Sequence, residues 1–261
     1  MSQSPFDLIK SNDEAIWRNG LDILIKEHDK ASFNGIVSML SDISWHKREA
    51  AALALQNWQT PDLPSLLKDC LDPSQIDQFY WILKILGNLG TEECISLIKP
   101  VLSYKDSELR GYAVRALGLK CSLNNARALY PMLNDTNWAV RKMAFEHLLS
   151  FGEIILDDLR KIILASFNSS NHSVIALFIK IGKDGIIPEL KTYYSKGSFS
   201  VRHAILSAIG ELESNQAIDF LIDGLSDPSW ALRLIASEQL SKLGPRAFDR
   251  LTASFGRTDS I

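Results

Sequence analysis

The feature of this sequence that most constrains its fold is an internal repeat with a spacing of 30 or 31 residues. Its clearest copies are residues 42–48, 135–141 and 227–233, in which Asp, Trp and Arg follow one another at intervals of three. The eight anchor positions of the repeat are Arg18, Arg48, Phe79, Arg110, Arg141, Asn171, Arg202 and Arg233. A fixed period of this length indicates a supersecondary unit that is repeated along the chain.

Apolar residues recur at fixed positions within each unit. The residues three and seven positions after every anchor are apolar, and these two offsets fall on one stripe of a helix. They are Leu21, Ala51, Ile82, Ala113, Ala144, Val174, Ile205 and Ala236, and then Ile25, Leu55, Leu86, Leu117, Leu148, Phe178, Ile209 and Leu240. We expect a helix of about four turns in each unit, with these side chains buried.

The ends of this helix are also marked. Five units have Ser, Asp or Asn four residues before the anchor, where a short polar side chain can cap a first turn: Ser44, Asp106, Asn137, Ser198 and Ser229. Four units have glycine eleven residues after the anchor, which predicts a left-handed helix end: Gly90, Gly152, Gly182 and Gly244. The rest of each unit has room for one more helix, and Pro100 and Pro131 predict a bend in two of these.

The pattern Asp-x-x-Trp-x-Val/Leu-Arg, followed by alanines, leucine and glycine as in residues 135–148, resembles HEAT repeats. The resemblance is in particular to the short type of about 30 residues found in phycobilin lyase subunits and many bacterial proteins. It covers residues 12–245 and implies an all-α fold, an α-solenoid that forms a right-handed superhelix of about eight helical hairpins. We expect one solenoid over residues 1–261, with capping helices at 5–11 and 245–255.

Composition narrows the classes of partner. Lys and Arg total 28 against 31 for Asp and Glu, so the net charge of −3 gives no general attraction to nucleic acid. The longest apolar run near the middle, residues 174–179, is far too short to span a bilayer, and the first residues lack the pattern of a signal peptide. Cys70, Cys94 and Cys121 lack the spacing of a zinc site. We therefore expect a cytoplasmic protein with no membrane span and reduced thiols.

No catalytic motif stands out in the sequence. It has no glycine-rich phosphate loop, nucleophile elbow or zinc-protease motif, and adjacent acids such as Asp157 and Asp158 point in different directions on a helix. The five histidines lack the His-Glu pairs with which the deoxyhypusine hydroxylases, another helical-repeat family, bind iron. We expect no catalytic residue, no metal and no cofactor.

Two sets of repeated residues have competing interpretations. The anchor arginines Arg18, Arg48, Arg110, Arg141, Arg202 and Arg233 could form a basic ladder for phosphates. The resemblance to HEAT repeats favours pairing with the turn aspartates Asp42, Asp135 and Asp227.

The tryptophans Trp45, Trp138 and Trp230 could stack on a base, as in the HEAT-like alkylpurine DNA glycosylases. Because they recur in one register, we expect a structural role for them, in packing between units.

A third set of residues forms a candidate binding surface. The residues one, five and nine positions after the anchors share a strip of the helix away from the apolar stripe, and in solenoids these helices commonly line the concave side. We name as the concave strip Tyr80, Lys84, Arg115, Lys142, Glu146, His172, Lys180 and His203. Its mildly basic centre suits an acidic protein segment, and a simple solvated face is the alternative. Two units depart from the repeat pattern, unit three at Phe79-Tyr80-Trp81 and unit six at residues 168–172. Either the local structure has drifted in these units, or a binding surface has replaced the usual structural residues.

These observations favour a non-enzymatic scaffold or adaptor that binds a partner protein along the concave strip. A bilin lyase subunit or chromophore-handling chaperone of the phycobilisome type is an alternative that follows from the resemblance alone. A HEAT-like alkylpurine DNA glycosylase is a second alternative, which the charge balance disfavours.

Overall fold

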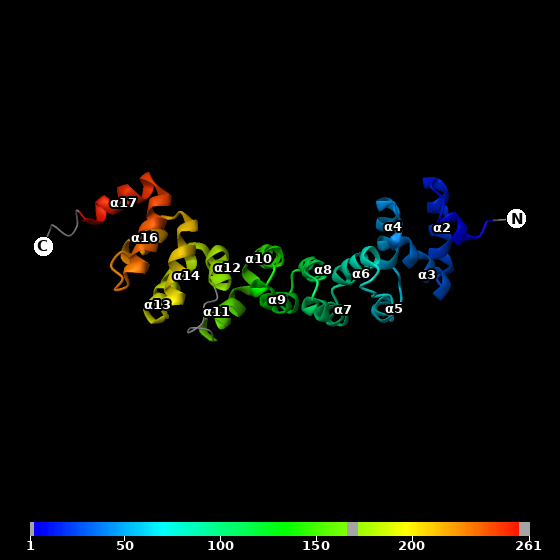
Figure 1. The fold of residues 1–261 in the computed structure, drawn as a ribbon, viewed down its shortest axis with the longest axis horizontal. Helices are drawn as coiled ribbons and strands as arrows, with labels where there is room; N and C mark the ends of the chain where they lie inside the picture. The colour runs from blue at the N-terminus through cyan, green and yellow to red at the C-terminus, as the bar shows by residue number, and fades with distance from the viewer. Residues whose placement is uncertain (1–2, 166–171, 256–261) are drawn as a thin grey trace. The chain divides into compact units, whose positions relative to one another are not determined.

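The computed structural model describes residues 3–165 and 172–255, and within these residues it contains helices and turns but no strand. The α-helices of this described part are α1 (Pro5–Leu8), α2 (Glu14–Glu27), α3 (Lys30–Ser38), α4 (Trp45–Gln56), α5 (Leu63–Asp69), α6 (Ile76–Leu89), α7 (Glu92–Ile98), α8 (Ser107–Gly118), α9 (Leu123–Leu129), α10 (Trp138–Phe151), α11 (Leu156–Ala165), α12 (His172–Gly182), α13 (Ile187–Lys196), α14 (Phe199–Ile209), α15 (Asn215–Gly224), α16 (Trp230–Leu243) and α17 (Pro245–Phe255) (Figure 1). The all-α fold predicted from the repeat is confirmed.

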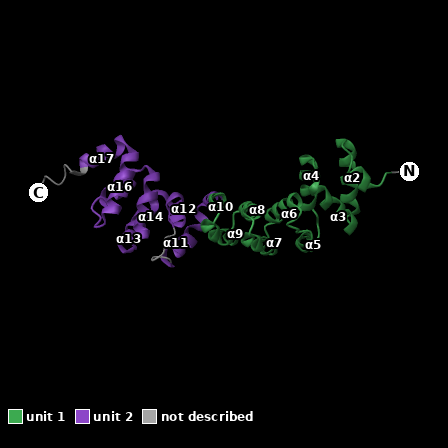
Figure 2. Ribbon diagram, viewed as in Figure 1, with its two compact units in different colours: residues 1–144 green, residues 145–261 purple. Residues whose placement is uncertain are grey.

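The chain forms two compact units, residues 1–144 and residues 145–261, whose boundary falls inside α10 (Figure 2). The even-numbered helices carry the apolar stripe of the repeat, and several of them stack on one another within each unit. In the first unit α4 packs on α6 and α6 on α8, and in the second unit α12 packs on α14 and α14 on α16. The odd-numbered helices pack against their even-numbered neighbours, so the hairpins are stacked as expected for helical repeats.

The apolar stripe forms the core of this stack. Fifteen of the sixteen side chains predicted to be buried are buried. The exception is Ile25 near the end of α2, which is 38% exposed. Small residues such as Ala51, Ala113 and Ala144 are fully covered, as expected where neighbouring helices approach closely.

The conserved spacing of Asp and Trp within the repeat has a local cause. The carboxylates of Asp42, Asp135 and Asp227 each accept a hydrogen bond of 2.8 Å from the backbone N–H two residues later. This closes a short turn, and the next residue is the tryptophan that begins α4, α10 or α16. The prediction of a side-chain cap is wrong for Ser44 and Ser229, whose hydroxyls make no cap hydrogen bond. Their backbone N–H groups are instead bound by the turn aspartate, which fixes the chain just before the helix.

Three of the four glycines predicted to end helices have a positive φ, which is 62° at Gly90, 65° at Gly152 and 61° at Gly244. Gly90 is left-handed helical, whereas the ψ of −137° at Gly244 lies outside that region. The prediction for Gly182 is wrong, because its φ is −79° and the left-handed residue is Lys183. Gly182 serves packing instead, since a Cβ there would collide with the side chain of Ile186.

The two prolines mark a change of helix type. Pro100 and Pro131 lie in the first turn of the 3-10 helices Lys99–Ser103 and Tyr130–Asn134, which continue directly from α7 and α9. A proline lacks the N–H that an α-helix interior requires, so the tighter helix replaces the α-helix at this point.

Candidate functional site

The anchor arginines are engaged within the fold. Arg110 of α8 forms two bonds of 2.7 Å, from Nε and Nη2, to the carboxylate of Asp135 in the next repeat. Both side chains are buried, and the Arg110 guanidinium, together with the N–H of Asn137, holds the pKa of Asp135 below its usual value despite burial. Arg141, in the same repeat as Asp135, donates to the carbonyl oxygens of Asp135 and Thr136. Two arginines from adjacent repeats thus fix one turn.

The same arrangement recurs in the second unit. Arg202 of α14 donates to Asp227 at 2.8 Å, and Arg233 donates to the carbonyl oxygens of Asp227 and Pro228. Tyr194 also donates to Asp227, at 2.6 Å. Burial raises the pKa of Asp227, but the donors Tyr194, Ser229 N–H and Arg202 outweigh it, and the net shift is downward.

The first unit departs from this arrangement near its start. Arg48 pairs with Asp77 at 2.8 Å, because Pro73 stands where the next repeat would supply the turn aspartate. Asp42 pairs with Lys47 rather than with Arg18, and Arg18 pairs with Glu14 on its own helix. All six anchor arginines therefore have partners within the chain.

The repeated tryptophans are more exposed than expected. Trp45, Trp138 and Trp230 occupy the first position of α4, α10 and α16, and their exposed fractions are 51%, 66% and 69%. Packing between repeats, the role inferred from their register, therefore accounts for less than half of their surface. A residue at the first helical position lies before the stripe that faces the core, which explains the exposure.

In the first unit, the structure brings the concave-strip residues onto neighbouring helices. The rings of Tyr80 on α6 and Tyr112 on α8 lie 5.0 Å apart. The Lys84 ammonium lies 4.4 Å above the ring of Trp81, while Arg115 of α8 and Lys142 of α10 are exposed. Lys84, Arg115 and Lys142 therefore place positive charge on three even-numbered helices of one unit.

In the second unit, the remaining strip residues form a different set of contacts. Lys180 pairs with Glu211 at 2.7 Å, and the rings of His172 and His203 lie 5.1 Å apart. Burial and the neighbouring His203 lower the pKa of His172. Glu146 is exposed on α10. The basic character of the strip is therefore carried by the first unit, and the segment 168–171 that was expected to open unit six lies outside the described residues.

An open pocket of about 310 Å³ adjoins the strip between α8 and α10. It is lined by Ser107, Glu108, Gly111, Tyr112, Arg115, Asn137, Ala139, Val140 and Met143. The hydroxyl of Tyr112 donates to Glu108, and burial together with this bond raises the pKa of Tyr112 to about 12. The pocket thus combines an apolar wall from α10 with polar groups from α8.

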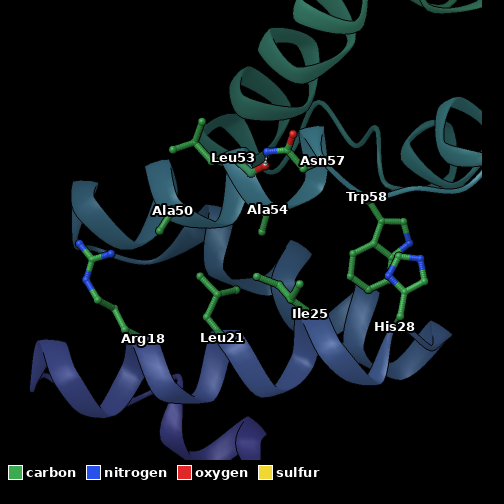
Figure 3. Close-up of a pocket in the computed structure, with 9 residues that line it drawn as sticks. All are labelled: Arg18, Leu21, Ile25, His28, Ala50, Leu53, Ala54, Asn57 and Trp58. Atoms are coloured by element: carbon green, nitrogen blue, oxygen red, sulfur yellow. Dashed lines mark hydrogen bonds between the residues drawn. The ribbon is translucent and has the colours of Figure 1, made fainter.

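A second cavity, of about 340 Å³, lies between α2 and α4 at the start of the chain. It is lined by Arg18, Leu21, Ile25, His28, Ala50, Leu53, Ala54, Asn57 and Trp58 (Figure 3). The stacked rings of His28 and Trp58, 4.0 Å apart, close one end, and Arg18 lies at the other. This cavity explains the exposure of Ile25. The small residues Ala50 and Ala54 are the sequence signal that could have indicated it.

Within residues 3–165 and 172–255, no group of three His, Cys, Asp or Glu side chains is arranged to hold a metal ion. In the same part of the chain, no helix is long and apolar enough to cross a membrane.

Comparison with known proteins identifies the repeat. Family descriptions of the HEAT repeat match residues 127–155 and residues 187–261. No curated protein matches the sequence. Among solved structures, human deoxyhypusine hydroxylase is 16% identical over 95% of both chains, with a TM-score of 0.34. The phycocyanin lyase complex of CpcE and CpcF from Nostoc is 12% identical, over 97% of this chain and 95% of that one, with a TM-score of 0.33.

Proposed function

Because the chain is a HEAT-repeat protein, we propose that it is a non-enzymatic scaffold that holds an acidic segment of a partner protein along the concave strip. HEAT repeats in general serve as protein-binding scaffolds. A stack of hairpins offers an extended surface to which several repeats contribute side chains, and a flexible segment can lie along it.

One observation carries this proposal. The side chains of Arg115 and Lys142 are exposed, and Lys84 lies on the helix next to α8, so the strip carries positive charge at the surface of three helices. Positive charge arranged in this way attracts acidic side chains, and it contributes more to the specificity of binding than to the affinity. The net charge of −3 makes such a local cluster more selective for a short acidic segment than for a nucleic acid backbone.

The test is a selection from a random peptide display library on the immobilised wild-type protein. We expect the enriched peptides to be acidic. We also expect them to lose binding to the triple variant Lys84→Glu, Arg115→Glu and Lys142→Glu, whose helicity and melting temperature should stay nearly unchanged. The matched control is Lys68→Glu, Lys99→Glu and Lys105→Glu, which alters the net charge equally at exposed lysines outside the strip. Equal binding to both triple variants would reject the strip as the site.

The two alternatives drawn from the sequence stay predictions with tests of their own. A bilin lyase subunit would transfer bilin together with a second repeat subunit. A DNA glycosylase would bind DNA in a salt-dependent way and release alkylated bases.

A further inference from the structure

The pocket between α8 and α10 exists because one strip position lacks a side chain. The residue directly after the anchor has a side chain in the other units, for example Tyr80, Lys142 and His203, but in α8 it is Gly111. A Cβ built on Gly111 would meet one atom within 4 Å, the Cε of Met143 at 3.8 Å. No close contact of the backbone therefore requires glycine here, and the space that a side chain would fill is part of the pocket.

The chemistry of the walls indicates what the pocket can hold. Val140, Met143 and Ala139 from α10 and the ring of Tyr112 from α8 provide apolar surface. A cavity of about 310 Å³ lies at the small end of the range for ligand sites, which suits a single large side chain of a bound peptide. Apolar side chains that enter such pockets supply much of the binding energy of protein interfaces.

The charges at the rim indicate how a bound segment would lie. Glu108 gives one end of the pocket a negative charge, although its carboxylate accepts the hydrogen bond from Tyr112. Arg115 lines the other end and is exposed, and Lys142 and Lys84 lie on the helices to either side of α8. An acidic residue of the segment would be attracted toward Arg115 and repelled by Glu108.

We infer that the pocket at Gly111 binds one large apolar side chain, such as Leu, Met or Phe, of the acidic partner segment, with an acidic neighbour of that side chain on Arg115. This inference rests on the proposed function, because it names the residue that anchors the segment on the same strip. The partner motif is therefore an apolar residue flanked by acids, rather than acidity alone.

Two substitutions of Gly111 separate pocket filling from other effects. Gly111→Leu places a side chain in the pocket, and Gly111→Ala adds only a Cβ for which there is room. Both replace glycine inside a helix by a better helix former, so neither is expected to unfold the protein. Circular dichroism and the melting temperature check this for each variant.

The measurement is the affinity of the peptides selected on the wild-type protein, together with copies whose apolar residue is changed to Ala. We expect Gly111→Leu to lower the affinity for the parent peptide roughly tenfold or more, and Gly111→Ala to change this affinity little. The Ala-substituted peptide should bind both variants with the same affinity. If the peptides bind Gly111→Leu with unchanged affinity and still fail to bind the charge-reversed triple variant, the pocket is not the anchor site, but the strip remains the binding surface. If the selected peptides bind the triple variant normally, or if no peptide is enriched, both the pocket inference and the proposed function are wrong.

Discussion

At the scale of single residues, two glycines with the same helical backbone have opposite roles. Gly87 of α6 lies where the backbones of α6 and α8 touch, and a Cβ there would overlap the carbonyl oxygen of Ala116. A Cβ on Gly111 of α8, in the next repeat, would make only an ordinary contact of 3.8 Å with the Cε of Met143. Sequence alone presents both as glycine within a helix, and only the packing of the neighbouring helix distinguishes them.

We therefore expect opposite effects of alanine at these positions. Gly87→Ala should lower the free energy of unfolding by about 2–3 kcal/mol, because rigid backbone would have to move. Gly111→Ala should raise it by up to about 1 kcal/mol, because alanine restricts the unfolded chain and favours the helix. Urea denaturation of both variants beside the wild type measures the difference, and a loss of stability in Gly111→Ala would contradict the room for a Cβ seen there.

At the scale of elements, the pairing of Arg110 with Asp135 joins consecutive repeats. The carboxylate accepts from an arginine of one repeat and from the turn of its own repeat, so loss of the acid affects both. The pair of Arg48 and Asp77 is different, since Asp77 is exposed and the side chain of Arg48 is partly exposed, so loss of the acid leaves the guanidinium in contact with solvent.

Removal of the acid should therefore have unequal costs at the two pairs. Asp135→Ala leaves the buried guanidinium of Arg110 without its carboxylate and should cost about 3 kcal/mol or more. Asp77→Ala, the matched control, removes an exposed partner and should cost less than about 1 kcal/mol. Thermal or urea unfolding of the two variants decides this, and similar losses would show that the Asp135 pair is no stronger than a surface ion pair.

The same aspartates give the fold a dependence on pH. The pKa values of Asp135 and Asp227 lie below the ordinary value of 3.8, so their stabilisation is complete above that pH and is lost as pH falls toward the folded-state pKa values. We expect the melting temperature of the wild type to drop below about pH 4. The double variant Asp135→Asn and Asp227→Asn, less stable at neutral pH, should drop less steeply there. An identical slope in both proteins would assign the acid sensitivity to other groups.

At the scale of the whole molecule, repeats within each compact unit are stabilised by packing on their neighbours. In such an array a local defect destabilises the adjacent repeats and has less effect on more distant ones. In a single globular core, a defect lowers the protection of amides against hydrogen exchange throughout the protein. Hydrogen exchange of the Gly87→Ala variant tests this directly. Amides of α4, α6 and α8 should exchange faster than in the wild type, and amides of α14 and α16 should keep their protection. A uniform increase over all helices would contradict this view.

The sequence was sufficient for the fold because the period of the repeat determines which side chains are buried. Fifteen of sixteen positions followed the stripe, and Ile25 departs from it where α2 and α4 leave a cavity. The pockets were not predicted, because they depend on the missing side chain of Gly111, on the small side chains of Ala50 and Ala54 and on the distance between helices. The exposure of Trp138 and the shift from Gly182 to Lys183 also arise from packing at helix ends, which periodicity does not encode.

The link from Arg110 to Asp135 has one more consequence. It spans 25 residues, and so does the link from Arg202 to Asp227. If three complete repeats were deleted in register, Arg110 would stand the same distance along the chain from Asp227, and the new junction would retain an arginine and an aspartate at the spacing of the two observed pairs. Gain or loss of whole repeats therefore changes the length of such a protein while the spacing of the arginine–aspartate link is kept.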